Sequence, residues 1–309
     1  MQLLPRLFSV IVGSVVTLST LKAEVSVVDD LGRTVTLSST PHRIISLAPS
    51  ITETLFAIGS GDQVAGVTDF CNHPPEATKK SRVGGMTNPN IEAIISLKPD
   101  LIVLSMEGNV REDFNKLLSI GVPVFVTNPR TLAGIHKSID DLGRLTGNTA
   151  TAAMLTRTMR HREDSIRSVA KQKTRVLLIV SLQPLIVVGS KTFLAEMVEM
   201  AGGENIAASA PLTYPTLSRE AVVAANPAAI IVMSGVFTNT SELVSLFPEW
   251  RTLSAVRENR IFRIDADLVS RPGPRAIDGL VALYQIIHAR LSGRKDTNEH
   301  KEESRSKIP

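Results

Sequence analysis

The sequence predicts an α/β protein of two similar lobes with parallel-type sheets, joined by one long rigid α-helix, with a ligand cleft between the lobes. Three observations predict this fold. Short β-prone runs alternate with helical segments, which is typical of parallel sheets covered by helices. A stretch of more than 20 residues without Gly or Pro interrupts the alternation. The strand-and-helix pattern then begins again.

Length and composition limit the class of protein. The 309 residues are enough for about two domains, each able to bury a core. The hydrophobic share of 43% and charged share of 21% are those of a globular protein, which excludes wholesale disorder. Lys and Arg are scattered and aromatic residues make up 4%, so no nucleic-acid partner is expected. The one cysteine excludes an intrachain disulfide, and a monomer is expected.

Residues 1–23 have the pattern of a cleaved signal peptide. Arg6 supplies a positive charge, residues 7–21 contain no charged residue, and Ala23 is a small residue at the cleavage site. A membrane anchor is the alternative, but this stretch is shorter than the roughly 20 residues that span a bilayer. No cysteine stands directly after this apolar stretch, which argues against a lipid anchor. An exported, soluble protein is expected.

The N-terminal lobe is assigned to residues 24–146. A β-prone run at 44–47 is followed by Ser50-Ile-Thr-Glu53, which has the form of a capping box that opens a helix toward Ile58. Alternating elements continue the pattern, and the run at 101–104 is apolar throughout, as in strands buried on both faces. The further expected elements are strands at 64–67, 101–104 and 122–126 and helices at 90–97 and about 110–120.

The connecting helix is assigned to residues 147–171, because residues 148–171 are rich in good helix formers. Such a helix would be about 30 Å long, enough to cross a domain. The C-terminal lobe is assigned to residues 172–292 and begins with a strand at 175–180. Residues 293–309 are charged and polar without apolar periodicity, so a disordered tail is expected.

A repeated unit supports two similar lobes. Glu92 lies seven residues before Pro99, Glu220 lies seven residues before Pro227, and an apolar strand follows in both places. Each glutamate is expected at a helix N-terminus, where the helix dipole favours an anion by under about 1 kcal/mol. Ligands of such proteins bind in the cleft between the lobes.

Seven motifs in this order resemble the periplasmic solute-binding proteins of ABC importers that carry cobalamin, haem or iron–siderophore complexes, in the class with a helical backbone. The resemblance is strongest to the cobalamin-binding members and covers roughly residues 25–291. It implies a periplasmic binding protein without a cofactor of its own, which carries a ligand containing cobalt or iron to an ABC permease in the inner membrane. The motifs are residues 43–53, 66–75, 83–92, 97–101, 201–205, 214–220 and 271–275.

The resemblance also implies roles for individual residues. Glu92 and Glu220 would dock on arginines of the two permease subunits. Methionine or serine stands at 86 and 105–106, where cobalamin-binding relatives have aromatic residues, and Trp250 lies away from the motifs. The implied ligand-binding residues are Phe70, Cys71, His73, Met86, Ser105, Met106, Tyr214 and Arg271.

Several of these residues have two interpretations. Cys71, His73 or Tyr214 could be an axial ligand of cobalt or iron. Alternatively, Cys71 is a buried free thiol and His73 packs beside two prolines. Arg271 and Arg275 could bind carboxylate, phosphate or amide groups of the ligand, or could belong to a solvated loop or an ion pair within one lobe. The remaining histidines are scattered, so a zinc or manganese site is not favoured.

The expected function is therefore capture of a large metal-containing ligand, a corrinoid before haem or a ferric siderophore. The alternative from another class is an exported enzyme that uses Cys71 and His73. The sequence contains no Gly-x-Ser-x-Gly, His-Glu-x-x-His or Walker-type motif. We expect a binding protein rather than an enzyme.

Overall fold

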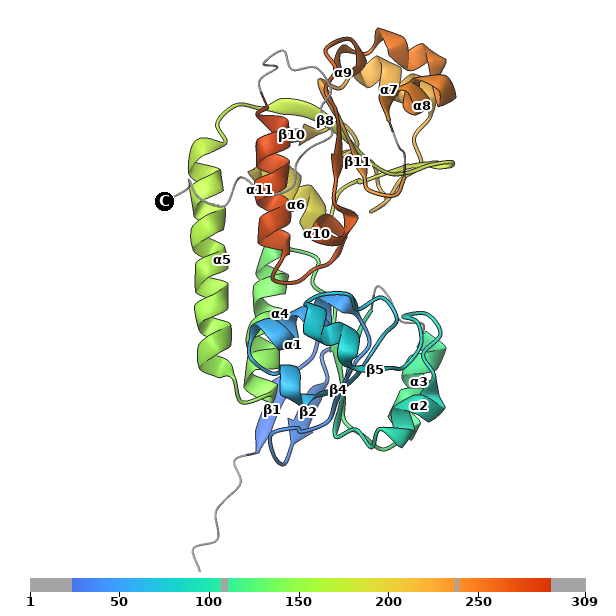
Figure 1. Ribbon diagram of the computed structural model, residues 1–309. Helices are drawn as coiled ribbons and strands as arrows, with labels where there is room; N and C mark the ends of the chain where they lie inside the picture. Colours follow the sequence, from blue (N-terminus) through green and yellow to red (C-terminus); the bar gives the residue numbers. More distant parts are fainter. Residues whose placement is uncertain (1–23, 107–110, 237–238, 290–309) are drawn as a thin grey trace, which may run out of the picture.

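The computed structural model describes residues 24–106, 111–236 and 239–289 (Figure 1). The predicted signal peptide and most of the predicted tail lie outside these residues. Two α/β lobes lie one above the other in Figure 1, and long helices run along one side of both. Within the described residues, no helix is both long and apolar enough to cross a membrane.

The N-terminal lobe contains a five-stranded parallel sheet in the order β5-β4-β3-β6-β7, beside an antiparallel hairpin of β1 and β2. Every residue of β6 is buried, as its unbroken apolar run predicts. The strands are β1 (Val25–Val28), β2 (Thr34–Leu37), β3 (Ile44–Ser46), β4 (Val64–Val67), β5 (Ser81–Arg82), β6 (Leu101–Ser105) and β7 (Val124–Thr127). The helices are α1 (Pro49–Ala57), α2 (Ile91–Ser96), α3 (Arg111–Ser119) and α4 (Leu132–Leu145), with 3₁₀ turns at Gly61–Gln63 and Pro75–Lys79.

The predicted connecting helix is α5 (Thr149–Val169), 21 residues long. Its buried residues, Ala152, Thr156, Met159 and Glu163, recur every three or four positions and form one stripe. In Figure 1, α4 and α11 (Ala276–Ile287) lie nearly end to end beside α5, one in each lobe. The connection between the lobes is therefore a layer of packed helices rather than a single helix.

The C-terminal lobe repeats the sheet of the first. Its parallel strands have the order β10-β8-β11-β12, which matches β4-β3-β6-β7, and β9 pairs antiparallel with β8. The strands are β8 (Thr174–Leu182), β9 (Leu185–Val187), β10 (Gly203–Asn205), β11 (Ala229–Met233) and β12 (Ile261–Ile264). The other helices are α6 (Phe193–Met200), α7 (Arg219–Ala225), α8 (Thr240–Leu246), α9 (Ser254–Arg257) and α10 (Ala266–Ser270), with a 3₁₀ turn at Pro248–Thr252.

The predicted repeat is confirmed in detail. Asn90 caps α2 and Ser218 caps α7, each through a side-chain oxygen that accepts a backbone N–H three residues later. Each helix ends close to a residue with positive φ before proline, Lys98 at 48° and Asn226 at 41°. The same helix, turn and strand therefore occur in both lobes.

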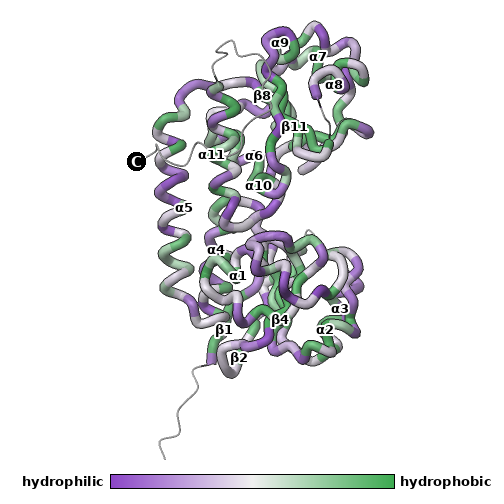
Figure 2. The backbone as a smooth tube through the Cα atoms, in the orientation of Figure 1, coloured by the Kyte–Doolittle hydropathy of each residue, from purple (hydrophilic) through white to green (hydrophobic). Residues whose placement is uncertain are grey.

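The hydrophobic core is continuous between the lobes. One cluster of buried side chains runs from Leu55 in α1 through Ile139 in α4 and Met159 in α5 to Leu178 in β8. Two further clusters lie on the other faces of the two sheets. Figure 2 shows the central strands as mostly hydrophobic and α5 as a mixture of hydrophobic and hydrophilic residues. Each lobe thus has a core of its own, as expected, and shares another.

The predicted capping box at residues 50–53 is wrong. The N-cap of α1 is Ala48, and its side chain makes no capping bond. Pro49 occupies the first helical position, which its fixed φ favours, so Ser50 lies within the first turn. Glu53 is consequently inside the helix, where it is 3% exposed.

Candidate functional site

A pocket lies between the two lobes, with a volume of about 310 Å³. Its N-terminal wall lies near the carboxyl ends of β3 and β6, the edge at which α/β sheets bind ligands. Its other wall is the end of α10 and the segment that follows it. The lining residues are Ala48, Pro49, Ser50, Phe70, Met86, Ser105, Ser270, Arg271 and Pro272.

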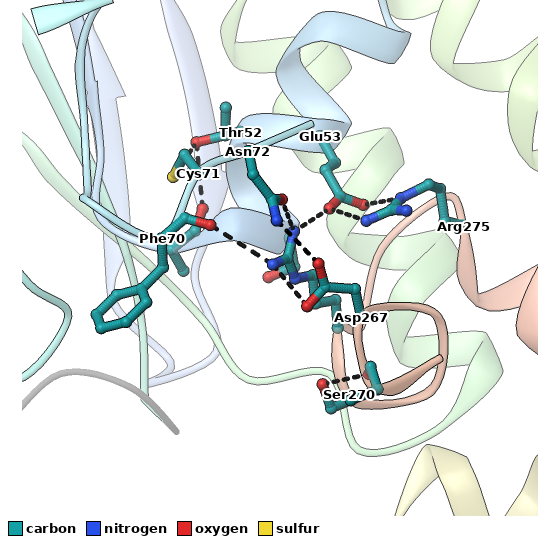
Figure 3. Close-up of polar contacts among 12 residues, drawn as sticks. Thr52, Glu53, Phe70, Cys71, Asn72, Asp267, Ser270 and Arg275 are labelled. Atoms are coloured by element: carbon teal, nitrogen blue, oxygen red, sulfur yellow. Dashed lines mark hydrogen bonds and ion pairs between the residues drawn. The ribbon is translucent and has the colours of Figure 1, made fainter. Parts of the chain in front are cut away.

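Four of the predicted ligand-binding residues line this pocket: Phe70, Met86, Ser105 and Arg271. Phe70 is 57% exposed, which is unusual for a phenylalanine. In Figure 3 its ring points away from the polar side chains beside it. The pocket therefore offers an aromatic face and a thioether on one side and a guanidinium on the other.

The other predicted residues lie elsewhere. Met106, 46% exposed, lines a neighbouring apolar hollow of about 490 Å³ with Leu31, Leu104, Arg111, Phe114 and Val126. Tyr214 is 41% exposed and His73 is partly buried, but neither lines the inter-lobe pocket. Sequence order alone could not separate Met106 and His73 from the pocket, because each lies within three residues of a residue that lines it.

The structure contradicts the prediction that Cys71 lines the cleft. Its side chain is fully buried, and Sγ lies 3.1 Å from Oγ1 of Thr52 and 3.2 Å from Oγ1 of Thr68. The Cys71 N–H donates to the carbonyl of Thr68, so a turn directs the thiol inward and the adjacent Phe70 outward. The alternative interpretation, a buried free thiol, describes its position.

A charged network that the sequence analysis missed joins the lobes beside the pocket (Figure 3). Glu53 of α1 accepts from Arg271 Nη1 at 2.8 Å, from Arg275 Nη2 at 2.7 Å and from Arg275 Nε at 2.9 Å. The Glu53 side chain is 2% exposed, so burial is compensated by two guanidinium groups. A sequence signal existed: Glu53 is the one charged residue between Arg43 and Asp62.

Arg271 has further partners in the network. Its Nη1 donates to Asn72 Oδ1 at 2.7 Å, and its Nη2 contacts Asp267 Oδ1 at 2.7 Å and the carbonyl of Phe70 at 3.5 Å. Asn72 Nδ2 also donates to Asp267 Oδ2 at 3.0 Å. The network therefore contains residues of both lobes and contacts the backbone of the exposed Phe70.

Arg275 forms an ion pair across the lobes, whereas the sequence analysis gave it a contact with the ligand, a place in a solvated loop or an ion pair within one lobe. Its bidentate contact with Glu53 has the geometry that guanidinium and carboxylate groups favour. The hydrogen bonds that Arg275 donates to Glu53 raise the pKa of Arg275, while partial burial opposes this shift. Arg275 is therefore a permanent cation in this contact.

The two glutamates of the repeat lie outside the pocket. Glu92 and Glu220 are exposed in the first turns of α2 and α7, and both helices lie on the side of the molecule away from α5 in Figure 1. The pKa of Glu220 is lowered by its own backbone N–H and then by the Ser218 hydroxyl. Glu220 thus presents a carboxylate that stays ionised at neutral pH.

The described residues contain no group of three or more His, Cys, Asp or Glu side chains placed to hold a metal ion. Trp250 is fully buried and stacks on Phe247 with 4.3 Å between ring centroids, in the C-terminal lobe. It belongs to the core cluster on the outer face of that sheet. Phe70 is thus the aromatic side chain of the inter-lobe lining.

Comparison with known proteins agrees with this geometry. A family model described as periplasmic binding protein matches residues 44–268. An uncharacterized ABC transporter substrate-binding lipoprotein of Bacillus subtilis, YvrC, is 33% identical over 274 residues, which cover 85% of this chain and 85% of the relative. The vitamin B12-binding protein of Vibrio cholerae is 31% identical over 242 residues, which cover 77% of this chain and 86% of the relative.

Solved structures show the same two-lobed fold. The periplasmic vitamin B12 binding protein BtuF of Vibrio cholerae has a TM-score of 0.71 and 29% identity, covering 80% of this chain and 96% of that chain. The periplasmic heme-binding protein RhuT from Roseiflexus sp. RS-1 has a TM-score of 0.71 and 27% identity, covering 80% and 99%. The family and fold expected from the motifs are confirmed. This chain belongs to the periplasmic binding protein family.

Proposed function

We propose that this protein binds a corrinoid between its lobes and delivers it to an ABC permease after export to the periplasm. The observation that carries the proposal is the inter-lobe pocket at the carboxyl edge of the N-terminal sheet, with exposed Phe70 beside Met86. An aromatic face and an adaptable thioether suit the broad surface of a macrocycle. Relatives named as vitamin B12-binding and ABC substrate-binding proteins support the same conclusion.

The size of the pocket defines how such a ligand would bind. Its volume of about 310 Å³ is at the lower end for small-molecule sites. A corrinoid would therefore extend beyond the volume that this pocket encloses. Haem is the second candidate, because RhuT shares the fold and Tyr214 is an exposed phenol that could ligate iron.

Titration of the purified protein with cyanocobalamin, haemin and a ferric siderophore tests the ligand. We expect a cyanocobalamin complex by calorimetry and a loss of about fivefold in affinity for Phe70→Ala, since an aromatic contact contributes about 1 kcal/mol. Met154→Ala is the control, because Met154 is 63% exposed on α5. Binding of haemin alone, or equal affinity of Phe70→Ala and the control, would contradict the corrinoid assignment.

Docking of the permease is assigned to Glu92 and Glu220. One exposed carboxylate on each lobe can contact a partner with two equivalent subunits and fix the orientation of the complex. The double variant Glu92→Gln/Glu220→Gln should abolish uptake by cells while the purified protein still binds its ligand. Glu258→Gln removes an exposed carboxylate elsewhere and serves as the control. Normal uptake by the double variant would refute the docking assignment.

A further inference from the structure

The positive charge that Arg271 brings to the inter-lobe pocket is balanced by neighbouring carboxylates. Among the described residues that line it, Arg271 is the ionisable side chain. Its side chain is 11% exposed, and its two terminal nitrogens contact four acceptors: Glu53, Asn72, Asp267 and the Phe70 carbonyl. A guanidinium has five N–H groups, so most of its donors are already used.

The whole network is electrically neutral. It contains two guanidinium groups, Arg271 and Arg275, and two carboxylates, Glu53 and Asp267. A carboxylate of a ligand that approached Arg271 would have to displace one of these partners and would meet the repulsion of both acids. An amide meets neither penalty, since its NH₂ group can donate to a carboxylate oxygen and its carbonyl can accept.

We propose that Glu53 and Asp267 determine ligand selectivity: by neutralising Arg271 they make the pocket accept a macrocycle with uncharged amide side chains and reject one that carries carboxylates. The inference rests on the proposed function, because it requires the ligand to contact the inter-lobe pocket. The inference adds to the proposed function the chemical class of the ligand's side chains, which are amides, and names Glu53 and Asp267 as the residues that select them.

Two corrinoids with the same ring test the effect of the ligand's side chains separately from the effect of the macrocycle. Dicyanocobinamide carries amides and dicyanocobyrinic acid carries carboxylates at corresponding positions. We expect the wild-type protein to bind the amide form at least about tenfold more tightly, because like charges in a partly desolvated site are unfavourable. The net charge of +4 on the whole chain would favour the acid, so this preference must arise locally.

Asp267→Asn tests the selecting residue. The substitution is isosteric, keeps an acceptor for Arg271 and leaves the network with one net positive charge. The preference for the amide form should fall to about threefold or less, because the acid gains an unbalanced cation. Asp164→Asn removes a carboxylate of an exposed ion pair with Arg167 on α5 and should leave the preference unchanged.

Asn72→Asp changes the charge in the opposite direction and should increase the preference. Equal affinity of the wild-type protein for both corrinoids, or the same preference in Asp267→Asn and the control, would overturn the inference and leave corrinoid binding intact. Binding of neither corrinoid would overturn the proposed function together with the inference. Thermal unfolding of each variant verifies that it is folded.

Discussion

Glu53 should be the side chain on which the contact between the lobes depends most. In Glu53→Gln, Oε1 can still accept from Arg271 and Arg275. The bond at 2.9 Å from Arg275 Nε to Oε2 is lost, because an amide NH₂ would face this donor. The two guanidinium groups also lose the negative charge that compensates them.

The expected cost follows from these contacts. Removing one member of a buried ion pair costs about 3–5 kcal/mol, and a hydrogen bond to a charged group contributes about 1.5–3 kcal/mol. Arg271 and Arg275 retain 11% and 20% side-chain exposure, so water can replace part of the lost interaction. We therefore expect Glu53→Gln to lower the free energy of unfolding by about 2–3 kcal/mol.

Urea unfolding followed by circular dichroism and by Trp250 fluorescence measures this cost. Trp250 is buried in the C-terminal lobe, whereas circular dichroism reports helices of both lobes. The two signals should change together, since the lobes share a core. Glu258→Gln is the control on an exposed glutamate. A loss for Glu53→Gln below about 0.5 kcal/mol, the range of ordinary surface substitutions, would refute the reasoning.

Three further predictions concern individual residues. Gly66→Ala should destabilise the protein by about 1–3 kcal/mol in urea unfolding, because its Cβ would lie 2.8 Å from the nearest side-chain carbon of the core; an unchanged midpoint would contradict this. In NMR titration, Glu220 should show a pKa below its ordinary value, and Ser218→Ala should move it upward without restoring it fully, since the larger cause is the Glu220 backbone N–H. Cys71→Ser should change ligand affinity by less than about twofold, because the thiol is buried away from the pocket; a tenfold loss would return Cys71 to the binding residues.

Elements with a strong local pattern could be predicted from the sequence. The unbroken apolar run of β6 and the helix-forming stretch of α5 each follow from a few adjacent residues, and the structure contains both. The repeated glutamate-to-proline unit also predicted two similar lobes correctly, because it repeats a whole helix, turn and strand.

The position of Glu53 could not be predicted in the same way. Ser and Glu three residues apart fit a capping box, and only the preceding proline moves the helix start and places Glu53 in the interior. Its partners Arg271 and Arg275 are 218 and 222 residues away in the chain. The burial of Cys71 could not be predicted from the sequence either, because it depends on a turn that directs the Phe70 side chain outward and the Cys71 side chain inward.

The continuous core has a consequence for recombination between relatives. Buried side chains of α4, α5 and α6 meet where the two halves join, so they must fit one another in shape. A chimera that fused the first half of this chain to the second half of a relative would combine surfaces shaped for different neighbours. A swap of whole halves that aims to change the ligand preference would therefore require redesign of the packed helices between the lobes. Substitution of residues that line the inter-lobe pocket would not.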